Sequence, residues 1–413
     1  MSDGVVVVGG GFAGFWAALA ARRVAPVQTD VVLVSREPVL QIRPRLYEAQ
    51  PERLQVDLLP LLERVGVDFV RGEAAALEHD ARTLVLADGK EIRYARLVVA
   101  TGSAMLRPPI PGADQAYAVD TVREAVAFDR GLAEIVGGGS PPTIAVVGAG
   151  FTGIELALEL RDRIACHGAA EQAEQAQILL VDRADVVGPE LGAGPRPVIE
   201  AALAEARVEL RLGATVVALA RDRLVFSDGE TIGADAVVLT TGMIAAGFAR
   251  HVPGEHDGLG RVVVDRFLRA PAAPDVFVAG DAAAADGGDG HLVLQSCQHA
   301  LQLGRFAGEN AARDLLRLPL LPYRQPPYIT CLDLGRSGAV FTRGWERVVE
   351  LTGAEAKAVK RRINTETIYP PPDATADELL AMSSIDVTLQ RRRRRPAAKA
   401  ASTRTVLTYG GPR

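Results

Sequence analysis

The chain has 413 residues, more than the roughly 250 to 300 at which a single hydrophobic core usually stops growing, so two or three domains are expected. Hydrophobic residues make up 48% of it and charged residues 23%, which is ordinary for a globular protein and excludes a disordered or fibrous one. A net charge of −5 gives no general attraction to nucleic acid, so no nucleic-acid partner is expected. Three scattered cysteines argue against a disulfide framework or a zinc site, and they fit a reducing cytoplasm and a protein without a metal.

The chain opens on an apolar stretch with the glycine spacing of a dinucleotide-binding turn, VVVVGGGFAGFWAALAA, which starts at Val5. This pattern predicts a buried strand, a tight turn and a buried helix. A signal peptide is a poorer interpretation, because Asp3 stands where a cationic region belongs. Gly9 permits the turn, Gly11 lets backbone N–H groups approach a diphosphate, and Gly14 lets the helix pack closely on the strand.

The same unit occurs a second time, which is stronger evidence than one glycine motif. The stretch IAVVGAGFTGIELALELRD repeats the first one, and its three glycines are Gly148, Gly150 and Gly153. Residues 84–102, LVLADGKEIRYARLVVATG, return as residues 224–242, LVFSDGETIGADAVVLTTG. A hairpin with an Asp-Gly turn and a strand that ends in Thr-Gly are therefore duplicated as well.

A downstream strand, APDVFVAGDAAAA, ends in Gly280 and Asp281 and completes the first unit. An acid at such a strand end can accept hydrogen bonds from a ribityl chain, so the first unit is the expected FAD site and the second binds NAD(P)H. The predicted fold is α/β, with two Rossmann-like domains, the second inserted in the first, and a C-terminal α+β segment. The expected boundaries are 1–112 and 249–325 for the FAD domain, 113–248 for the NAD(P) domain and 326–413 for the C-terminal segment with its basic tail.

The residues expected to bind the two ribose groups depart from the usual pattern of one acid at the end of the second strand. Asp182 ends the second strand of the NAD(P) unit and can bind a ribose 2′-OH, which favours NADH over NADPH. Arg183 beside it could instead hold a 2′-phosphate, so both cofactors stay open. In the FAD unit Ser35 stands where an acid is usual, followed by Arg36 and Glu37, and either Glu37 or a backbone group can take that role.

The residues expected to bind the two cofactors come from these strand ends and turns. They are Gly9, Gly11, Phe12, Ala13, Gly14, Ser35, Arg36, Glu37, Arg43, Ala74, Thr101, Gly102, Gly148, Gly150, Phe151, Thr152, Gly153, Asp182, Arg183, Thr241, Gly242, Gly280, Asp281 and Gln298.

The motifs VVVVGGGFAG, VVATGS, VVGAGFTGIELA, VVLTTG and VFVAGD together resemble the two-dinucleotide flavoprotein (pyridine nucleotide-disulfide oxidoreductase) superfamily, and within it the type II NADH dehydrogenase (NADH:quinone oxidoreductase) branch. That branch reads AQxAxQ near the flavin and the quinone, and CQHALQ here is similar, with Cys297 in place of the alanine. The resemblance implies that Gln298 and Gln302 face the acceptor. It also implies that Glu155, in the second glycine motif, lies near the nicotinamide. The C-terminal runs YIT and GAVF differ from the membrane-binding end of that branch and predict a sheet and a closing helix.

The stretch SCQHALQLG concentrates polar side chains on the first turns of an expected helix that begins at Ser296. Gln298, His299 and Gln302 are predicted to hydrogen-bond the flavin carbonyls or a quinone-like oxygen, and His299 could supply a proton. The catalytic candidates are thus these three residues and Glu155. A buried structural histidine and a small buried thiol at Cys297 are the simpler alternatives.

The predicted function is an FAD-dependent NAD(P)H dehydrogenase that passes a hydride from NADH through FAD to a quinone or other small acceptor. The alternatives are an FAD-dependent oxidoreductase of specialised metabolism and a non-catalytic flavin redox sensor. The run RRRRRP, residues 391–396, is either an inert solvated tail or a weak anchor on the inner face of a membrane. Oligomeric state is open between a monomer and a homodimer.

Overall fold

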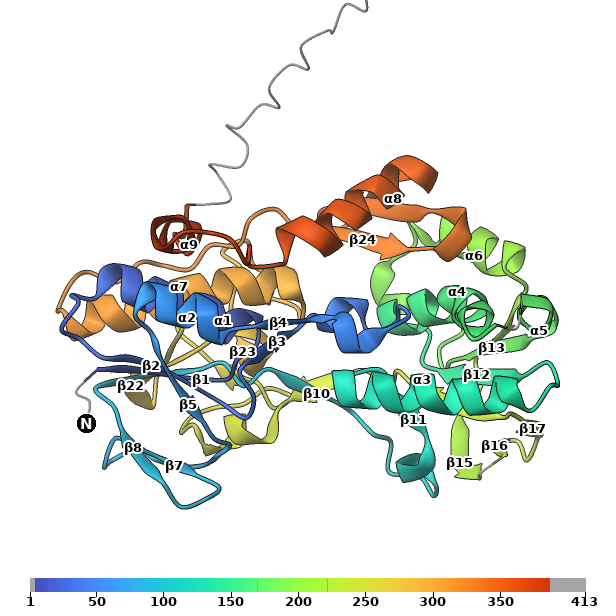
Figure 1. The fold of residues 1–413 in the computed structure, drawn as a ribbon, viewed down its shortest axis with the longest axis horizontal. Helices are drawn as coiled ribbons and strands as arrows, with labels where there is room; N and C mark the ends of the chain where they lie inside the picture. Colours follow the sequence, from blue (N-terminus) through green and yellow to red (C-terminus); the bar gives the residue numbers. More distant parts are fainter. Residues whose placement is uncertain (1–3, 169, 221, 387–413) are drawn as a thin grey trace, which may run out of the picture.

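Two α/β units lie side by side in the computed structural model, which describes residues 4–386 except 169 and 221 (Figure 1). The first unit is built on a six-stranded sheet in the order β21-β22-β9-β1-β2-β5, in which β21 alone runs antiparallel to its neighbour. Helices α1, α2 and α7 cover one face of this sheet (Figure 1). The elements are β1 (Val5–Val8), β2 (Val31–Ser35), β5 (Asp68–Arg71), β9 (Arg96–Val99), β21 (Arg269–Ala270), β22 (Ala273–Val278), α1 (Phe12–Val24), α2 (Leu59–Val65) and α7 (Cys297–Leu315).

The second unit is built on a five-stranded, all-parallel sheet in the order β11-β18-β12-β13-β14. Its central strands β18, β12 and β13 are apolar apart from Thr143 and Gln177 at their starts, as expected for parallel strands covered on both faces, whereas the edge strand β14 carries Glu209 and Arg211. The elements are β11 (Tyr117–Ala118), β12 (Thr143–Val147), β13 (Gln177–Val181), β14 (Val208–Arg211), β18 (Ala236–Leu239), α3 (Val122–Gly137), α4 (Phe151–Cys166), α5 (Ala170–Gln175) and α6 (Arg196–Glu205).

The duplication seen in the sequence is a duplication of topology. The order β9-β1-β2-β5 in the first sheet corresponds, strand by strand, to β18-β12-β13-β14 in the second. The next strand differs in its place along the chain, because β22 follows β9 whereas β11 precedes β12. Each unit also carries a three-stranded antiparallel sheet with a register shift at the same place in its first strand. These sheets consist of β6 (Ala74–Glu78), β7 (Thr83–Leu86) and β8 (Glu91–Arg93), and of β15 (Val216–Ala220), β16 (Arg223–Phe226) and β17 (Thr231–Gly233). The chain returns to the first sheet only with β21 and β22, so the second unit is inserted in the first, as predicted.

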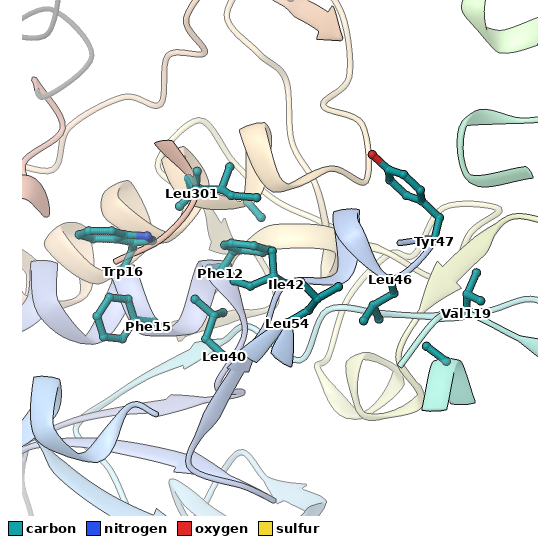
Figure 2. Close-up of a cluster of buried hydrophobic side chains, with 14 of the residues drawn as sticks. Phe12, Phe15, Trp16, Leu40, Ile42, Leu46, Tyr47, Leu54, Val119 and Leu301 are labelled. Atoms are coloured by element: carbon teal, nitrogen blue, oxygen red, sulfur yellow. The ribbon is translucent and has the colours of Figure 1, made fainter. Parts of the chain in front are cut away.

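Helix α1 is apolar on every side because it is buried between the first sheet and α7. Figure 2 shows Phe12, Phe15 and Trp16 of α1 in one buried cluster with Leu301 of α7. Leu40, Ile42, Leu46 and Tyr47, from the segment after β2, continue the cluster toward the second unit (Figure 2). The cluster therefore fixes α1 in the core of the first unit and extends from there toward the second.

Two glycines let α7 approach α1 closely. A Cβ atom on Gly304 would lie 2.2 Å from the carbonyl oxygen of Ala13, and one on Gly308 would lie 2.0 Å from that of Ala17. These distances are far below van der Waals contact, so no side chain fits at either position without moving a helix. The spacing of four residues places both glycines on the same face of α7.

A two-stranded antiparallel ribbon joins the two units. It pairs β10 (Ser103–Met105) with β19 (Met243–Ala245), and these strands follow the two Thr-Gly pairs of the repeat. The ribbon thus pairs equivalent strands of the two copies, which gives the units a pseudo-twofold relationship about its centre. Figure 1 shows β10 between the two units.

The C-terminal segment forms the predicted sheet and closing helix. Strands β24 (Ile329–Asp333), β25 (Ala339–Arg343) and β26 (Val348–Thr352) make an antiparallel sheet, and α8 (Gly353–Arg362) packs on it. A π-helical turn, Ile363–Thr367, follows α8, and α9 (Ala376–Met382) lies over the first unit (Figure 1). The basic run at residues 391–395 lies outside the described residues.

The remaining elements are short connections. They are the strands β3 (Val39–Gln41), β4 (Gln55–Asp57), β20 (Val262–Val263) and β23 (Ala283–Ala284), and the 3₁₀ turns Arg43–Arg45, Pro51–Arg53, Ala113–Gln115, Pro189–Leu191, Gly247–His251, Gly280–Ala282 and Gly335–Ser337. In the part of the chain that the structure describes, none of the helices combines the length and the apolar character needed to cross a membrane.

The close approach of α1 and α7 predicts that Gly308→Ala destabilises the protein. The added methyl group would collide with backbone atoms of Ala17, which should cost about 3 kcal/mol despite the higher helix propensity of alanine. Urea unfolding followed by circular dichroism measures the change. Gly137→Ala is the matched control, because it also lies in a helix and nothing lies within 4 Å of its added methyl group. Equal stability of the two variants would contradict the packing argument.

Candidate active site

One cavity of about 2880 Å³ lies between the two units and the C-terminal segment. It is lined by residues 9–13 of the first glycine loop (residues 9–14), by residues 148 and 150–152 of the second glycine loop (residues 148–153), by the start of α7 and by residues of the C-terminal sheet and helix. Both copies of the repeat therefore open into the same space.

The first glycine loop has the geometry of a diphosphate cradle. Gly9 has a φ of 109°, and a Cβ atom there would lie 2.2 Å from the carbonyl oxygen of Ala100. Gly14 packs its α-carbon against the loop, since a Cβ atom would lie 1.7 Å from Gly9 O. Gly11 faces open space and caps α1 without a side-chain hydrogen bond, so the N–H groups of the helix are free for an anion.

The second glycine loop reproduces this geometry. Gly148 has a φ of 115°, and a Cβ atom there would lie 2.3 Å from Thr240 O. A Cβ atom on Gly153 would lie 1.8 Å from Gly148 O. Gly14 and Gly153 are the two predicted glycines that do not line the cavity, because their task is to bring helix and strand together. Gly150 caps α4 without a side-chain hydrogen bond, as Gly11 caps α1.

Other predicted FAD contacts lie along the first unit's part of the cavity. Thr101 is the most informative of them, because its Oγ1 is buried with no hydrogen-bond partner among the described residues. A buried hydroxyl in that position needs a partner, and a ligand in the cavity can supply one. The others that line the cavity are Phe12, Ala13, Ser35, Arg36, Glu37, Ala74, Gly102 and Gly280.

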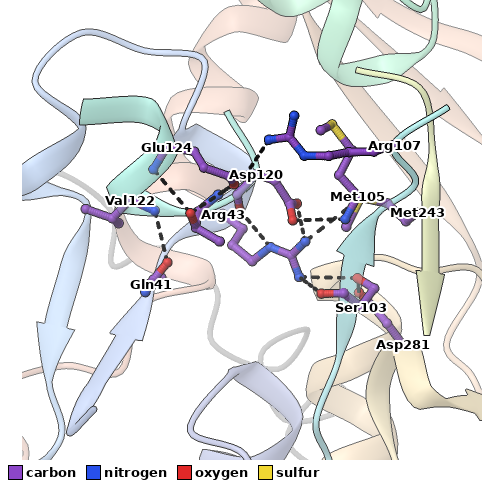
Figure 3. Close-up of polar contacts among 11 residues, drawn as sticks. Gln41, Arg43, Ser103, Met105, Arg107, Asp120, Val122, Glu124, Met243 and Asp281 are labelled. Atoms are coloured by element: carbon purple, nitrogen blue, oxygen red, sulfur yellow. Dashed lines mark hydrogen bonds and ion pairs between the residues drawn. The ribbon is translucent and has the colours of Figure 1, made fainter. Parts of the chain in front are cut away.

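Asp281 and Arg43 belong to a polar network beneath the ribbon (Figure 3). Ser103 Oγ donates to Asp281 Oδ2 at 2.6 Å, and burial raises the pKa of Asp281. The Arg43 guanidinium donates to Ser103 O and Oγ at 3.2 Å and forms an ion pair with Asp120, which precedes α3. Arg43 lines the cavity, and it also ties the first unit to the second.

Asp182 lies at the edge of the second glycine loop. Its Oδ2 accepts from Ala149 N at 2.6 Å and its Oδ1 from Ala184 N at 2.8 Å, which fixes the carboxylate at the cavity wall. Arg183 is exposed beside it, and Thr241 Oγ1 donates to Leu106 O at 2.5 Å. Phe151, Thr152, Arg183, Thr241 and Gly242 also line the cavity.

Helix α7 begins as predicted, with Ser296 as its N-cap. Ser296 Oγ accepts from His299 N at 3.4 Å. Gln298 lines the cavity and pairs with the backbone of Ile329 through both ends of its amide, at 3.5 and 3.4 Å. Gln302 lines it too, and its Nε2 donates to Ile385 O at 3.3 Å. Both glutamines therefore fix the C-terminal segment to α7 while they face the cavity.

His299 does not lie among the cavity-lining residues, unlike the two glutamines. It is 1% exposed, its Nδ1 lies 2.8 Å from Ser296 Oγ, and its ring packs on Tyr328 with centroids 5.3 Å apart. Burial lowers the pKa of His299 to about 4, so the ring is neutral at pH 7. The helix turns His299 away from the cavity. A neutral imidazole in that position fits the simpler alternative, in which His299 is a buried structural residue.

The cavity-facing cysteines behave as thiols. Burial raises the pKa of Cys297 to about 11 and that of Cys331 to about 11. Cys297 packs on the main core, whereas Cys331 packs on the small cluster under α8 and donates to Ala356 O at 3.7 Å. The described residues contain no group of His, Cys, Asp and Glu side chains arranged to hold a metal ion.

Glu155 is held by a residue that the sequence gave no reason to select. Lys360 of α8 donates to Glu155 Oε1 at 2.6 Å and to Cys331 O at 3.0 Å, and both charged groups are buried at the cavity wall. Asp333 N donates to Glu155 Oε1 at 2.9 Å. Burial raises the pKa of Glu155, and although burial opposes the charge of Lys360, the carboxylate raises the pKa of that ammonium.

The pair continues into a cluster that leads away from the cavity. Tyr47 Oη donates to Asp333 Oδ2 at 3.3 Å, and Lys357 forms an ion pair with Asp333. Glu159 lies one helical turn after Glu155, and burial raises its pKa to about 7, with Asp333 adding to the effect. Polar groups from all three parts of the chain therefore meet at this cluster, with Tyr47 contributed by the first unit.

We expect Lys360→Met to cost about 3 to 5 kcal/mol, because it leaves the Glu155 carboxylate buried without its counter-ion. The double variant Glu155→Gln with Lys360→Met should recover most of this loss, since neither charge remains. Urea unfolding at pH 7 measures the loss of stability in Lys360→Met, in Glu155→Gln and in the double variant. If the loss in the double variant equalled the sum of the two single losses, the ion pair would not be coupled as the structure has it.

The raised pKa of Glu159 predicts a pH-dependent stability. A folded pKa of about 7 lies above the unfolded value, so the contribution of Glu159 is fully present below about pH 4 and is lost as the pH rises through 7. Relative to Glu159→Gln, the wild type should lose on the order of 3 kcal/mol between pH 4 and pH 8. Unfolding curves at several pH values test this. The exposed Glu134→Gln should show no such trend, and a trend of the opposite sign at Glu159 would refute the argument.

Comparison with known proteins agrees with this geometry. A family model described as pyridine nucleotide-disulphide oxidoreductase matches residues 3–304. An NADH dehydrogenase-like protein of Mycobacterium tuberculosis (strain CDC 1551) is 43% identical over 390 residues, which cover 92% of this chain and 98% of that protein. A demethylphylloquinone reductase of Synechocystis is 28% identical over 376 residues, which cover 87% of this chain and 90% of that protein.

A solved structure extends the agreement to the fold. NDH2 from Plasmodium falciparum in complex with NADH superposes with a TM-score of 0.75 at 11% sequence identity, covering 94% of this chain and 98% of that chain. The family match spans both glycine loops and the first turns of α7, and the relative covers the C-terminal segment as well. The chain therefore belongs to the pyridine nucleotide-disulphide oxidoreductase family.

Proposed function

We propose that the protein is an FAD-dependent NADH dehydrogenase that passes electrons from NADH to a quinone. The observation that carries the proposal is that both glycine loops open into one cavity, at the ends of the equivalent helices α1 and α4. FAD bound there would supply the two-electron chemistry that links NADH to an acceptor. The names of the relatives, an NADH dehydrogenase-like protein and a demethylphylloquinone reductase, support both halves of this reaction.

The residues of the first unit fit FAD. The glycine loop leaves the N–H groups of α1 free, the buried Thr101 hydroxyl has no partner among the described residues, and Asp281 presents a carboxylate at a strand end. We assign the diphosphate to the glycine loop and the ribityl hydroxyls to Asp281. Domain limits at 112, 248 and 325 remain part of this proposal.

The residues of the second unit fit a nicotinamide dinucleotide, with a preference for NADH. Asp182 is fixed at the cavity wall by two backbone N–H groups and retains lone pairs for a ribose hydroxyl. Its charge would repel a 2′-phosphate. Arg183 is the residue that could reverse this preference, because it is exposed and has room to turn toward the cavity.

The acceptor end of the cavity lies where α7 meets the C-terminal segment. Gln298 and Gln302 line it, and the Glu155 and Lys360 pair forms part of the same wall. Reduction of a quinone to a quinol takes up two protons, and Lys360 Nζ holds protons at this wall beside Glu155 Oε1. We assign proton supply to this pair and not to the neutral His299.

A further part of the proposal concerns contact between the protein and a membrane. We propose that the basic run at residues 391–395, which lies outside the described part of the chain, contacts an anionic membrane surface. Each basic side chain near such a surface contributes about 1 kcal/mol. Bound to that surface, the protein would reach a quinone dissolved in the membrane without needing a membrane-spanning helix.

The test is a pair of anaerobic half-reactions. The purified protein should be yellow, and NADH should bleach the flavin absorbance faster than NADPH does. Mixing the reduced protein with a water-soluble naphthoquinone in a stopped-flow instrument should restore the absorbance at a rate independent of NADH. A flavin that stays oxidised with both nucleotides would rule out the dehydrogenase, and a flavin that no quinone reoxidises would rule out the acceptor.

A further inference from the structure

Arg347 is a buried cation at the cavity that has no anionic partner. The side chain is 6% exposed and lines the cavity, and no Asp or Glu oxygen of the described residues lies within 4.0 Å of its guanidinium. It donates to Tyr328 Oη at 2.6 Å and to Glu190 O at 3.2 Å, and its Cζ lies 4.5 Å from the centre of the Tyr328 ring. Both hydrogen-bond partners are uncharged.

The other cation of the same hairpin has a different environment. Arg343, four residues earlier, also lines the cavity, but it is exposed and forms an ion pair with Glu350 at 2.5 Å. Among the described residues, buried Arg163 and Arg261 pair with carboxylates, Asp129 and Asp257. Buried Arg22 and Arg161 have no carboxylate partner in the described part of the chain, but each guanidinium donates to several backbone carbonyls, three for Arg22 and four for Arg161. Within the same part of the chain Arg347 has only one carbonyl and one phenol, which replace less of the hydration that a buried guanidinium loses. It also lines the cavity, where a ligand can bring the missing charge.

The hairpin that carries Arg347 is fixed against the second unit. Arg347 Cγ lies 3.4 Å from the position that a Cβ atom on Gly192 would take, and Arg347 O lies 2.7 Å from the corresponding position on Gly194. Arg347 itself has a φ of 54°, and Arg82 has a φ of 50° at the same place in the turn of the β6–β7 hairpin, so this left-handed conformation belongs to the hairpin turn. The turn places the Arg347 side chain against the loop 188–194.

That loop lies next to the second glycine loop. Gly188 N donates to Ala149 O at 2.9 Å, and Glu190 Oε1 lies 2.5 Å from the position that a Cβ atom on Gly150 would take. Arg347, which donates to Glu190 O, is therefore linked through this loop to the start of α4, where free N–H groups favour an anion. Glu190 is exposed, and its carboxylate lies beside Gly150 without an ion pair to Arg347.

We propose that Arg347 is a clamp for the diphosphate of the nicotinamide dinucleotide. The guanidinium reaches from the C-terminal segment and binds phosphate oxygens that rest on the start of α4, so that the dinucleotide itself joins the segment to the second unit. Arginine suits this role because its planar fork can bind two phosphate oxygens at once. The inference rests on the proposed function, since it names a further residue for the same cofactor.

The test measures binding, so that it does not depend on turnover. Isothermal titration of the oxidised flavoprotein with ADP-ribose, which carries the diphosphate without nicotinamide, is compared with titration with adenosine, which carries no phosphate. In Arg347→Gln the affinity for ADP-ribose should fall at least tenfold, and the affinity for adenosine should stay within twofold. Arg343→Gln is the matched control, from the same hairpin and cavity, and should leave both affinities within twofold.

Two further variants separate charge from structure. Arg347→Lys keeps the charge without the fork and should lose at least threefold for ADP-ribose, which decides the matter if the glutamine variant does not fold. Tyr328→Phe removes the hydroxyl partner of the guanidinium and should keep the affinity for ADP-ribose within threefold. If Arg347→Gln and Arg347→Lys both bind ADP-ribose like the wild type, the clamp is overturned. Flavin reduction by NADH in the wild type is measured separately, so this failure would leave the dehydrogenase intact.

The other source of an anion is an acidic acceptor. Reoxidation of the reduced protein by a neutral naphthoquinone and by its sulfonate is therefore compared in Arg347→Gln. Under the proposal, the ratio of the two rates stays as in the wild type. A selective loss of the sulfonate rate, with ADP-ribose affinity unchanged, would assign Arg347 to the acceptor and overturn the clamp.

Discussion

The pairing of β10 with β19 is the interaction on which the rest of the structure depends. These strands are equivalent positions of a duplicated unit, and their antiparallel pairing sets the two copies face to face. Each copy leaves its glycine loop at the carboxyl end of its parallel sheet, where ligands of such sheets bind. Because the pairing turns these two ends toward each other, two cradles made by one sequence pattern share a cavity. The ion pair of Arg43 with Asp120 strengthens the same junction from the side.

Much of the fold could be predicted because the duplicated unit depends on local backbone constraints. Gly9 and Gly148 must adopt positive φ values, and Gly14 and Gly153 must touch the loop oxygen, so their spacing reports a strand, a turn and a helix. The return of the chain to the first sheet could also be predicted, because the strand that ends in Gly280 and Asp281 supplies the acid that the first unit needs at its strand end. The approach of α7 to α1 was not predicted. Its glycines, Gly304 and Gly308, only acquire meaning once the partner helix is known.

The candidate site was harder to predict, because side-chain roles depend on elements far apart in the chain. Glu155 was selected from its motif, but its partner Lys360 lies in a charged helix whose sequence resembles an ordinary solvated one. His299 was selected because it stands among the polar side chains at the start of the helix that follows the Gly-Asp strand. The structure leaves it out of the cavity wall, and burial lowers its pKa to about 4. Arg347 left no signal at all in the sequence. An arginine in a hairpin turn is unremarkable until its burial, and the absence of a carboxylate beside it among the described residues, are known.

The charges on the cavity wall explain why the C-terminal segment belongs to the site. Among the described residues, the charged side chains that the segment contributes to the wall are Arg343, Arg347 and Lys360, all of them cations. The two units contribute eight acids and seven arginines to the wall, so their part of it is close to neutral and the cations of the segment tip the balance. Arg343 and Lys360 are paired with Glu350 and Glu155, which leaves the charge of Arg347 available to a ligand. Both proposed dinucleotides are anions, so this cation lowers the cost of bringing a second negative group into the cavity. A segment that shares no repeat with the two units can therefore complete a site that the repeat alone leaves without a spare positive charge.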